Sequence, residues 1–146
     1  MRIMEGKKAF ECREKFVSCF VDRNSDYYRD NILCGTAFLE KGSYYGYLWE
    51  CYLPSEIESE QACLEFLATI KSFYVLWDLH PDASRPKEYW KYPKHAVLEM
   101  SIQDYMENCT KLPEDIYIFD DSFSWSIALT HESNLKNERW CLFRRS

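Results

Sequence analysis

The stretch that decides the fold is residues 114–132, which read EDIYIFDDSFSWSIALTHE. A short apolar run at 116–119 meets a polar turn at 120–122, and large apolar residues then alternate with small ones. Alternation with a period of two, rich in aromatic and β-branched residues, is typical of a strand with one face in a core. We therefore expect an antiparallel hairpin, whose buried face is formed by Phe123, Trp125, Ile127 and Leu129.

Segments before this hairpin carry helix signals. Apolar residues recur at helical spacing over residues 7–22, which predicts a first helix. Ser55 with Glu58, and Ser101 with Asp104, have the spacing of N-terminal capping boxes. The first pair predicts a helix that ends near Lys71, with Cys63, Phe66, Leu67 and Ile70 as its buried stripe. The second pair predicts another helix directly after Ser101.

Further strands are expected at residues 72–80, 95–100 and 140–143. The first is apolar on both faces, which is typical of a central strand that is covered on two sides. Two apolar runs, at 32–39 and 44–53, flank Lys41-Gly42-Ser43 and predict a second hairpin, with helical turns as the alternative. The sum is a single domain over residues 1–146, of the α+β class, with about three helices packed on a mostly antiparallel sheet.

Composition narrows the function classes. The 146 residues carry a formal charge of −6, which disfavours nucleic acid as a partner and favours a basic protein. No apolar stretch approaches the roughly 20 residues that span a bilayer, and the first residues lack a signal-peptide pattern. The seven cysteines are odd in number and show no C-x-x-C spacing, so neither a disulfide framework nor a cysteine zinc site is indicated. We expect a cytoplasmic protein without a cofactor.

One set of side chains could support catalysis. Asp78 and His80 are two apart and share a strand face, while His131 and Glu132 end the alternating strand on opposite faces by parity. A carboxylate beside an imidazole can orient a base or hold a metal. This set gives the alternative function of a small metal-dependent hydrolase, but no zinc-binding spacing such as H-E-x-x-H supports it. The favoured interpretation is that these polar strand ends complete the fold and that recognition occurs elsewhere.

Two groups of residues are candidates for recognition. Tyr44, Tyr45 and Tyr47 crowd around Gly46, and aromatic residues are enriched among interface anchors. An acidic cluster is predicted at the hairpin, formed by Asp120 and Asp121 together with Glu114 and Asp115. Core packing of the tyrosines and a solvated turn are the alternatives for these two groups.

Four segments resemble a group of small uncharacterised bacterial proteins, some of which are suspected to be immunity partners of toxins. They read LWEC at 48–51, VLWDLH at 75–80, EYWKYPKH at 88–95 and the hairpin stretch itself, from Asp115. The resemblance spans residues 44–132 and implies kinship of fold, without any site residue to carry over.

Together these observations favour a protein-binding module, with toxin neutralisation as its more specific form. An acidic and aromatic face would then cover a basic partner through Tyr44, Tyr45, Tyr47, Asp120 and Asp121. The hydrolase is the first alternative, and a homodimer formed through the aromatic patch is the second.

Overall fold

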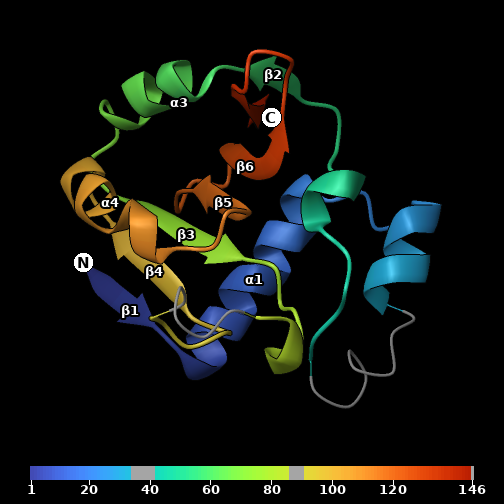
Figure 1. Cartoon of the computed structure of the whole chain (residues 1–146). Helices are drawn as coiled ribbons and strands as arrows, with labels where there is room; N and C mark the ends of the chain where they lie inside the picture. Colours follow the sequence, from blue (N-terminus) through green and yellow to red (C-terminus); the bar gives the residue numbers. More distant parts are fainter. Residues whose placement is uncertain (34–41, 86–90, 146) are drawn as a thin grey trace.

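The computed structural model describes residues 1–33, 42–85 and 91–145 (Figure 1). Within them lies a seven-stranded sheet in which every neighbouring pair is antiparallel, in the order β1-β4-β3-β5-β6-β7-β2. The strands are β1 (Arg2–Met4), β2 (Glu56–Glu58), β3 (Phe73–Trp77), β4 (Val97–Met100), β5 (Ile116–Phe119), β6 (Trp125–Ser133) and β7 (Arg139–Arg145).

Three helices of at least seven residues occur in the described ranges: α1 (Gly6–Phe20), α3 (Glu60–Leu67) and α4 (Ile102–Asn108). Shorter turns are the π-helix η1 (Tyr28–Leu33) and the 3-10 turns η2 (Leu48–Cys51), η3 (Asp82–Ser84) and η4 (Cys109–Lys111). The predicted α+β class is confirmed. The sheet is larger than expected because the three-residue strands β1 and β2 carry no periodic pattern in the sequence.

Helices cover both faces of the sheet, so the molecule has two apolar cores. One core joins α3 and α4 to the sheet through Cys63, Leu67 and Tyr105, while Phe16 and Phe20 of α1 belong to the core on the opposite face. The central strand β3 contributes to both, since Val75 faces the first core and Leu76 the second. This confirms that residues 72–80 contain a strand buried on two sides.

The hairpin of β5 and β6 is confirmed, with Ile118 opposite Ile127 in its register. The expectation that only one face of β6 is buried is wrong, because Ser126 and Thr130 are fully buried on the other face. Their hydroxyls are hydrogen-bonded, Ser126 to the Tyr52 hydroxyl at 2.9 Å and Thr130 to the Trp140 carbonyl at 3.1 Å. Small polar residues therefore mark a second buried face here, rather than a solvated one.

Phe123 does not continue the apolar face of β6 as expected. Its φ of 51° lies in the left-handed region, which turns its ring to the core of α1, 5.3 Å from the ring of Phe119. The alternation holds only from Trp125 onward, where regular strand geometry begins.

The capping box at Ser101 is confirmed: its hydroxyl accepts from the Asp104 amide, and the Asp104 carboxylate accepts from the Ser101 amide. The box expected at Ser55 is wrong. The residues after Ser55 pair with β7 as strand β2, and Ser59 caps α3 instead by accepting from the Ala62 amide at 3.0 Å. α3 then ends at Leu67 rather than near Lys71.

The second predicted hairpin is also wrong where it can be compared. Residues 28–33 form η1, residues 34–41 lie outside the described residues, and residues 44–53 form no strand. That last segment contains η2, and its end makes an isolated bridge between Tyr52 and Val21. Hydrogen bonds that involve side chains, rather than a strand ladder, attach this segment to the end of the sheet.

A matched pair of substitutions on α1 tests the two-core arrangement. Phe16 is fully buried against the rings of Phe20, Tyr52, Tyr117 and Phe119, at centroid distances of 4.8 to 6.2 Å. We expect Phe16→Ala to lower the free energy of unfolding by about 3–5 kcal/mol in urea titrations. Phe10→Ala removes an exposed ring from the same helix and should change it by less than about 0.5 kcal/mol. Equal effects would contradict this packing.

Candidate functional site

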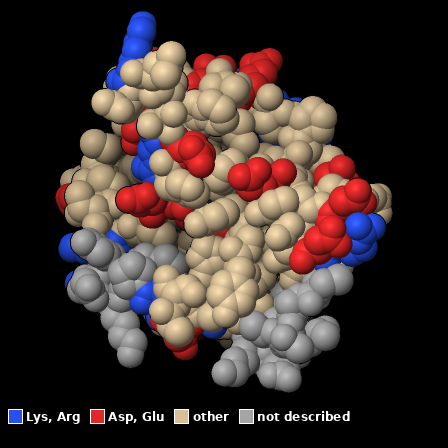
Figure 2. Space-filling view, turned by 45° about the vertical axis from the view of Figure 1, so that its right-hand side comes forward, with Lys and Arg blue, Asp and Glu red and all other residues tan. Residues whose placement is uncertain are grey.

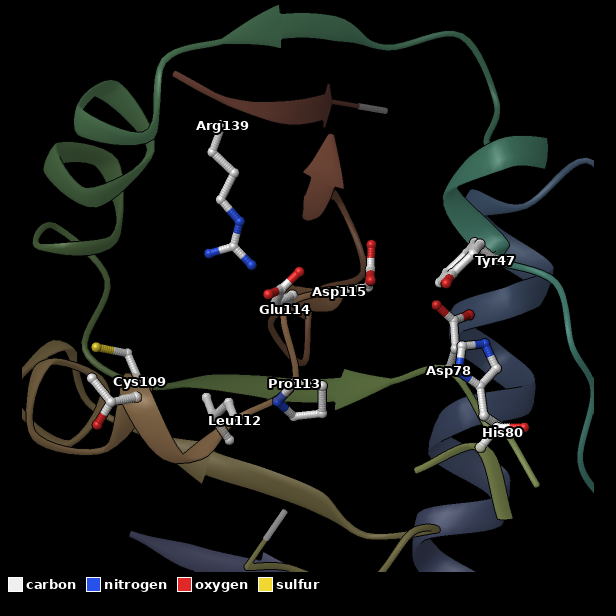
Figure 3. Close-up of a pocket in the computed structure, with 11 residues that line it drawn as sticks. Tyr47, Asp78, His80, Cys109, Leu112, Pro113, Glu114, Asp115 and Arg139 are labelled. Atoms are coloured by element: carbon white, nitrogen blue, oxygen red, sulfur yellow. The ribbon is translucent and has the colours of Figure 1, made fainter. Parts of the chain in front are cut away.

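A cleft of about 710 Å³ opens where β3 ends and β5 begins. Figure 3 shows its side chains, which come from four parts of the chain: the residues after β3, the segment from η4 to β5, Tyr47 and Arg139 of β7. Asp78 and Asp115 become neighbours there because Trp77 and Ile116 are opposite each other in the register of β3 and β5. The described lining comprises Tyr47, Asp78, His80, Ser84, Cys109, Thr110, Leu112, Pro113, Glu114, Asp115 and Arg139.

The carboxylate of Asp78 is the most buried charge carrier in this lining, with 2% of its surface exposed. It accepts three hydrogen bonds: from the Tyr44 hydroxyl at 3.0 Å, the Leu48 amide at 2.9 Å and the Tyr117 hydroxyl at 2.8 Å. Tyr44 and Leu48 belong to the segment that fails to form a strand. Asp78 therefore fastens that segment to the end of the sheet.

Burial raises the pKa of Asp78 from its ordinary value of 3.8 to about 6, although its hydrogen bonds and His80 oppose the shift. The same burial raises the pKa values of Tyr44 and Tyr117 well above their ordinary value, so both hydroxyls keep their protons and can donate. The lining of the cleft thus contains a buried carboxyl whose pKa is raised to about 6.

Arg13 supports the wall behind the cleft. This buried guanidinium donates to four backbone carbonyls: Trp77 at 2.8 Å, Ala96 at 3.0 Å, and Lys94 and His95 at 3.2 Å each. Burial lowers its pKa to about 10, which still leaves it charged at neutral pH. Arg13 therefore links α1 to the end of β3 and to the residues that lead into β4.

Two histidines flank Tyr47 at the cleft margin. The Tyr47 ring centroid lies 5.1 Å from that of His80 and 5.0 Å from that of His131. His80 Nε2 donates to the Gly46 carbonyl at 2.9 Å. Asp115 accepts from His131 Nδ1 at 2.9 Å, from the His131 amide at 3.0 Å and from Trp49 Nε1 at 3.0 Å. Both imidazoles are thus held by the fold.

The proposed catalytic set is only partly brought together. Asp78 and His80 line the cleft, whereas His131 and Glu132 lie outside its lining and contact each other, with His131 Nε2 at 3.4 Å from a Glu132 carboxylate oxygen. A register shift between Leu129 and Ser133 breaks the strict parity that the sequence suggested for this pair. Within the three described ranges, no three His, Cys, Asp or Glu side chains are arranged to hold a metal ion.

The expected recognition residues lie at two opposite ends of the sheet. Tyr44 is buried beneath the cleft and is not a surface residue, which corrects its assignment as a contact. Tyr45 is 68% exposed, and Tyr47 is half-buried in the cleft wall. Asp120 and Asp121 follow β5 at its far end, where Asp120 accepts from Trp125 Nε1 at 2.9 Å and caps the turn.

The four acidic residues predicted at the hairpin therefore do not form a single cluster. The four residues of β5 separate Glu114 and Asp115 from Asp120 and Asp121. Glu114 and Asp115 instead share an edge of the sheet with Asp78. The signal was present, because Asp78 and Asp115 each flank an apolar core strand directly, but only the pairing of β3 with β5 brings the two flanks together.

The raised pKa of Asp78 makes the stability of the folded protein depend on pH. Its pKa is higher in the folded protein than in the unfolded chain, so its contribution is greatest below about pH 4 and is lost as the pH rises through about 6. Urea titrations should show that the parent protein loses up to roughly 3 kcal/mol relative to Asp78→Asn between pH 4 and pH 7. A constant difference between the two proteins would contradict the raised pKa.

Comparison of the chain with protein-family models, with curated proteins and with solved structures finds no match. None of the described helices combines the length and the apolar character of a membrane span. The geometry and charge of the cleft are therefore the basis on which a function can be proposed.

Proposed function

We propose that this chain is a protein-binding module whose cleft receives basic side chains of a partner protein. The observation that carries the proposal is the charge of the cleft. Three carboxylates, those of Asp78, Glu114 and Asp115, lie in its described lining beside a single guanidinium, that of Arg139. Complementary charge at such a surface speeds association and excludes partners of the same sign.

Arg139 does not neutralise this excess. Its Nε donates to the Thr130 carbonyl at 2.9 Å, and its Nη1 lies 3.8 Å from a carboxylate oxygen of Glu60 on α3. The guanidinium is thus shared between the sheet and α3. Glu114 is exposed at the mouth of the cleft, and no described residue forms an ion pair with it. It is the carboxylate best placed to meet an incoming cation.

The shape of the cleft suits a long basic side chain. Its volume falls within the range of roughly 300–1,000 Å³ that is usual for ligand pockets. Leu112, Pro113 and the Tyr47 ring supply apolar surface against which an arginine or lysine stem can pack. An aromatic ring also attracts a cation electrostatically, and arginine stacks on such rings more readily than lysine does.

Toxin neutralisation is the more specific form of this proposal. It is supported by the net charge of −6, by the acidic side chains that spread over the face in Figure 2, and by the resemblance to suspected immunity proteins. Exposed Tyr45 lies two residues from the cleft wall and can extend the contact beyond the cleft.

Charge reversal at either end of β5 tests the proposal. The probe is a capped peptide of alternating arginine and glycine, titrated into isotopically labelled protein and followed by amide NMR. We expect shifts at Tyr47, Glu114 and Asp115, and at least about a tenfold weaker affinity for Glu114→Lys. Asp121→Lys changes the net charge equally at the far end of β5 and should alter the affinity less than about twofold.

Three results would count against this cleft. Equal weakening by both substitutions would show that only the net charge matters, and weakening by Asp121→Lys alone would move the contact to the hairpin turn. Equal affinity for a matched peptide of glutamate and glycine would remove the electrostatic basis altogether.

A further inference from the structure

A second surface, at the outer edge of the sheet, is separate from the cleft. β2 is the last strand of the sheet and pairs with β7 on one side only, so its other edge is open within the described residues (Figure 1). An open edge presents backbone donors and acceptors that an extended chain can pair with.

Apolar side chains are exposed beside this edge on one face. Ile57 lies opposite Leu142 in the register of β2 and β7, and Trp140 is the next residue of β7 on that face. Ile57 is 64% exposed and Trp140 39% exposed, whereas Leu142 packs at the margin of the α1 core. The sheet thus offers an apolar strip directly next to its open backbone.

Acidic side chains occupy the alternate positions of β2. Glu56 and Glu58 lie opposite Phe143 and Cys141, on the face of the α3 core. Glu56 is 4.0 Å from Arg145, but both side chains are more than half exposed, so this ion pair is weak. Glu58 forms no ion pair with any other residue of the described chain.

The charges of Glu56 and Glu58 disfavour a second copy of the chain at the open edge of β2 and favour a basic strand there. If two copies paired through β2 in antiparallel fashion with Ile57 opposite Ile57, each Glu56 would face a Glu58, and like charges directly opposite destabilise a strand pair. A strand with the order basic, apolar, basic would place its two cationic side chains opposite the two glutamates of β2. Its apolar side chain would then extend the apolar strip at Ile57.

We propose that β2 receives an extended segment of a basic partner protein by strand addition. The segment places cationic side chains opposite Glu56 and Glu58 and an apolar side chain opposite Ile57. The assignment does not depend on the cleft, since it uses a different edge of the molecule and different residues.

The test uses capped peptides with the central sequence Lys-Val-Lys between threonines, titrated into the labelled protein at low salt. We expect amide shifts and slower hydrogen exchange at residues 56–58. N-methylation of the peptide valine keeps the charge but removes a backbone donor, and should weaken binding by about tenfold or more. A Glu-Val-Glu peptide should not bind.

A charge swap in the protein completes the test. The double substitution Glu56→Lys with Glu58→Lys should reverse the preference, so that the variant binds Glu-Val-Glu and not Lys-Val-Lys. Asp121→Lys, far from β2 in the sheet, and Glu114→Lys, at the cleft, should both leave Lys-Val-Lys binding within about twofold.

Retained binding by Glu114→Lys shows that the edge acts independently, even if the proposed cleft function fails. Strand addition is overturned if the peptides bind equally with and without N-methylation, if the shifts fall at Tyr47 and Glu114 instead, or if no shift appears at residues 56–58.

Discussion

The hydrogen bonds to the buried carboxylate of Asp78 hold together the end of the sheet where the cleft opens. A carboxylate this deeply buried is unfavourable unless donors surround it, and here two tyrosine hydroxyls and one backbone amide do so. These three donors come from residues 44–48, which run into η2, and from β5, which is distant in sequence. Removing Asp78 would release the segment that carries Tyr44, Tyr47 and Leu48, and with it one wall of the cleft. The same group thus supports the fold and shapes the cleft.

Arg13 performs a complementary task behind the cleft. The end of β3 and the approach to β4 expose backbone carbonyls that lack strand partners, and the guanidinium satisfies four of them from α1. Its multiple donors suit this fixed arrangement in a way that a lysine ammonium does not. A buried carboxyl and a buried guanidinium therefore both hold this end of the sheet.

The strongly periodic elements could be predicted from the sequence, and the cleft could not. α1, β3, the Ser101 cap and the β5–β6 hairpin follow from local patterns whose physical cause is local. The apolar run at 44–53, which follows a turn glycine, favours a hairpin strand over helical turns, yet Asp78 holds Tyr44 and Leu48 in a segment that leads into the 3-10 turn η2. The spacing of Glu58 from Ser55 is that of a helix-capping box, but Glu58 pairs with β7 as part of strand β2 instead. The expectation that polar strand ends only complete the fold is too narrow, since Asp78 and His80 both stabilise the fold and line the cleft.

Amide hydrogen exchange can show whether Asp78 holds the wall of the cleft in place. In Asp78→Ala, the Leu48 amide loses its acceptor, so its exchange should accelerate by about a factor of ten or more, together with that of Tyr44. Amides in the middle of α1 and in β6 should keep the rates of the parent protein. Unchanged exchange at Leu48, or equal acceleration throughout the molecule, would show that Asp78 does not specifically hold this wall of the cleft.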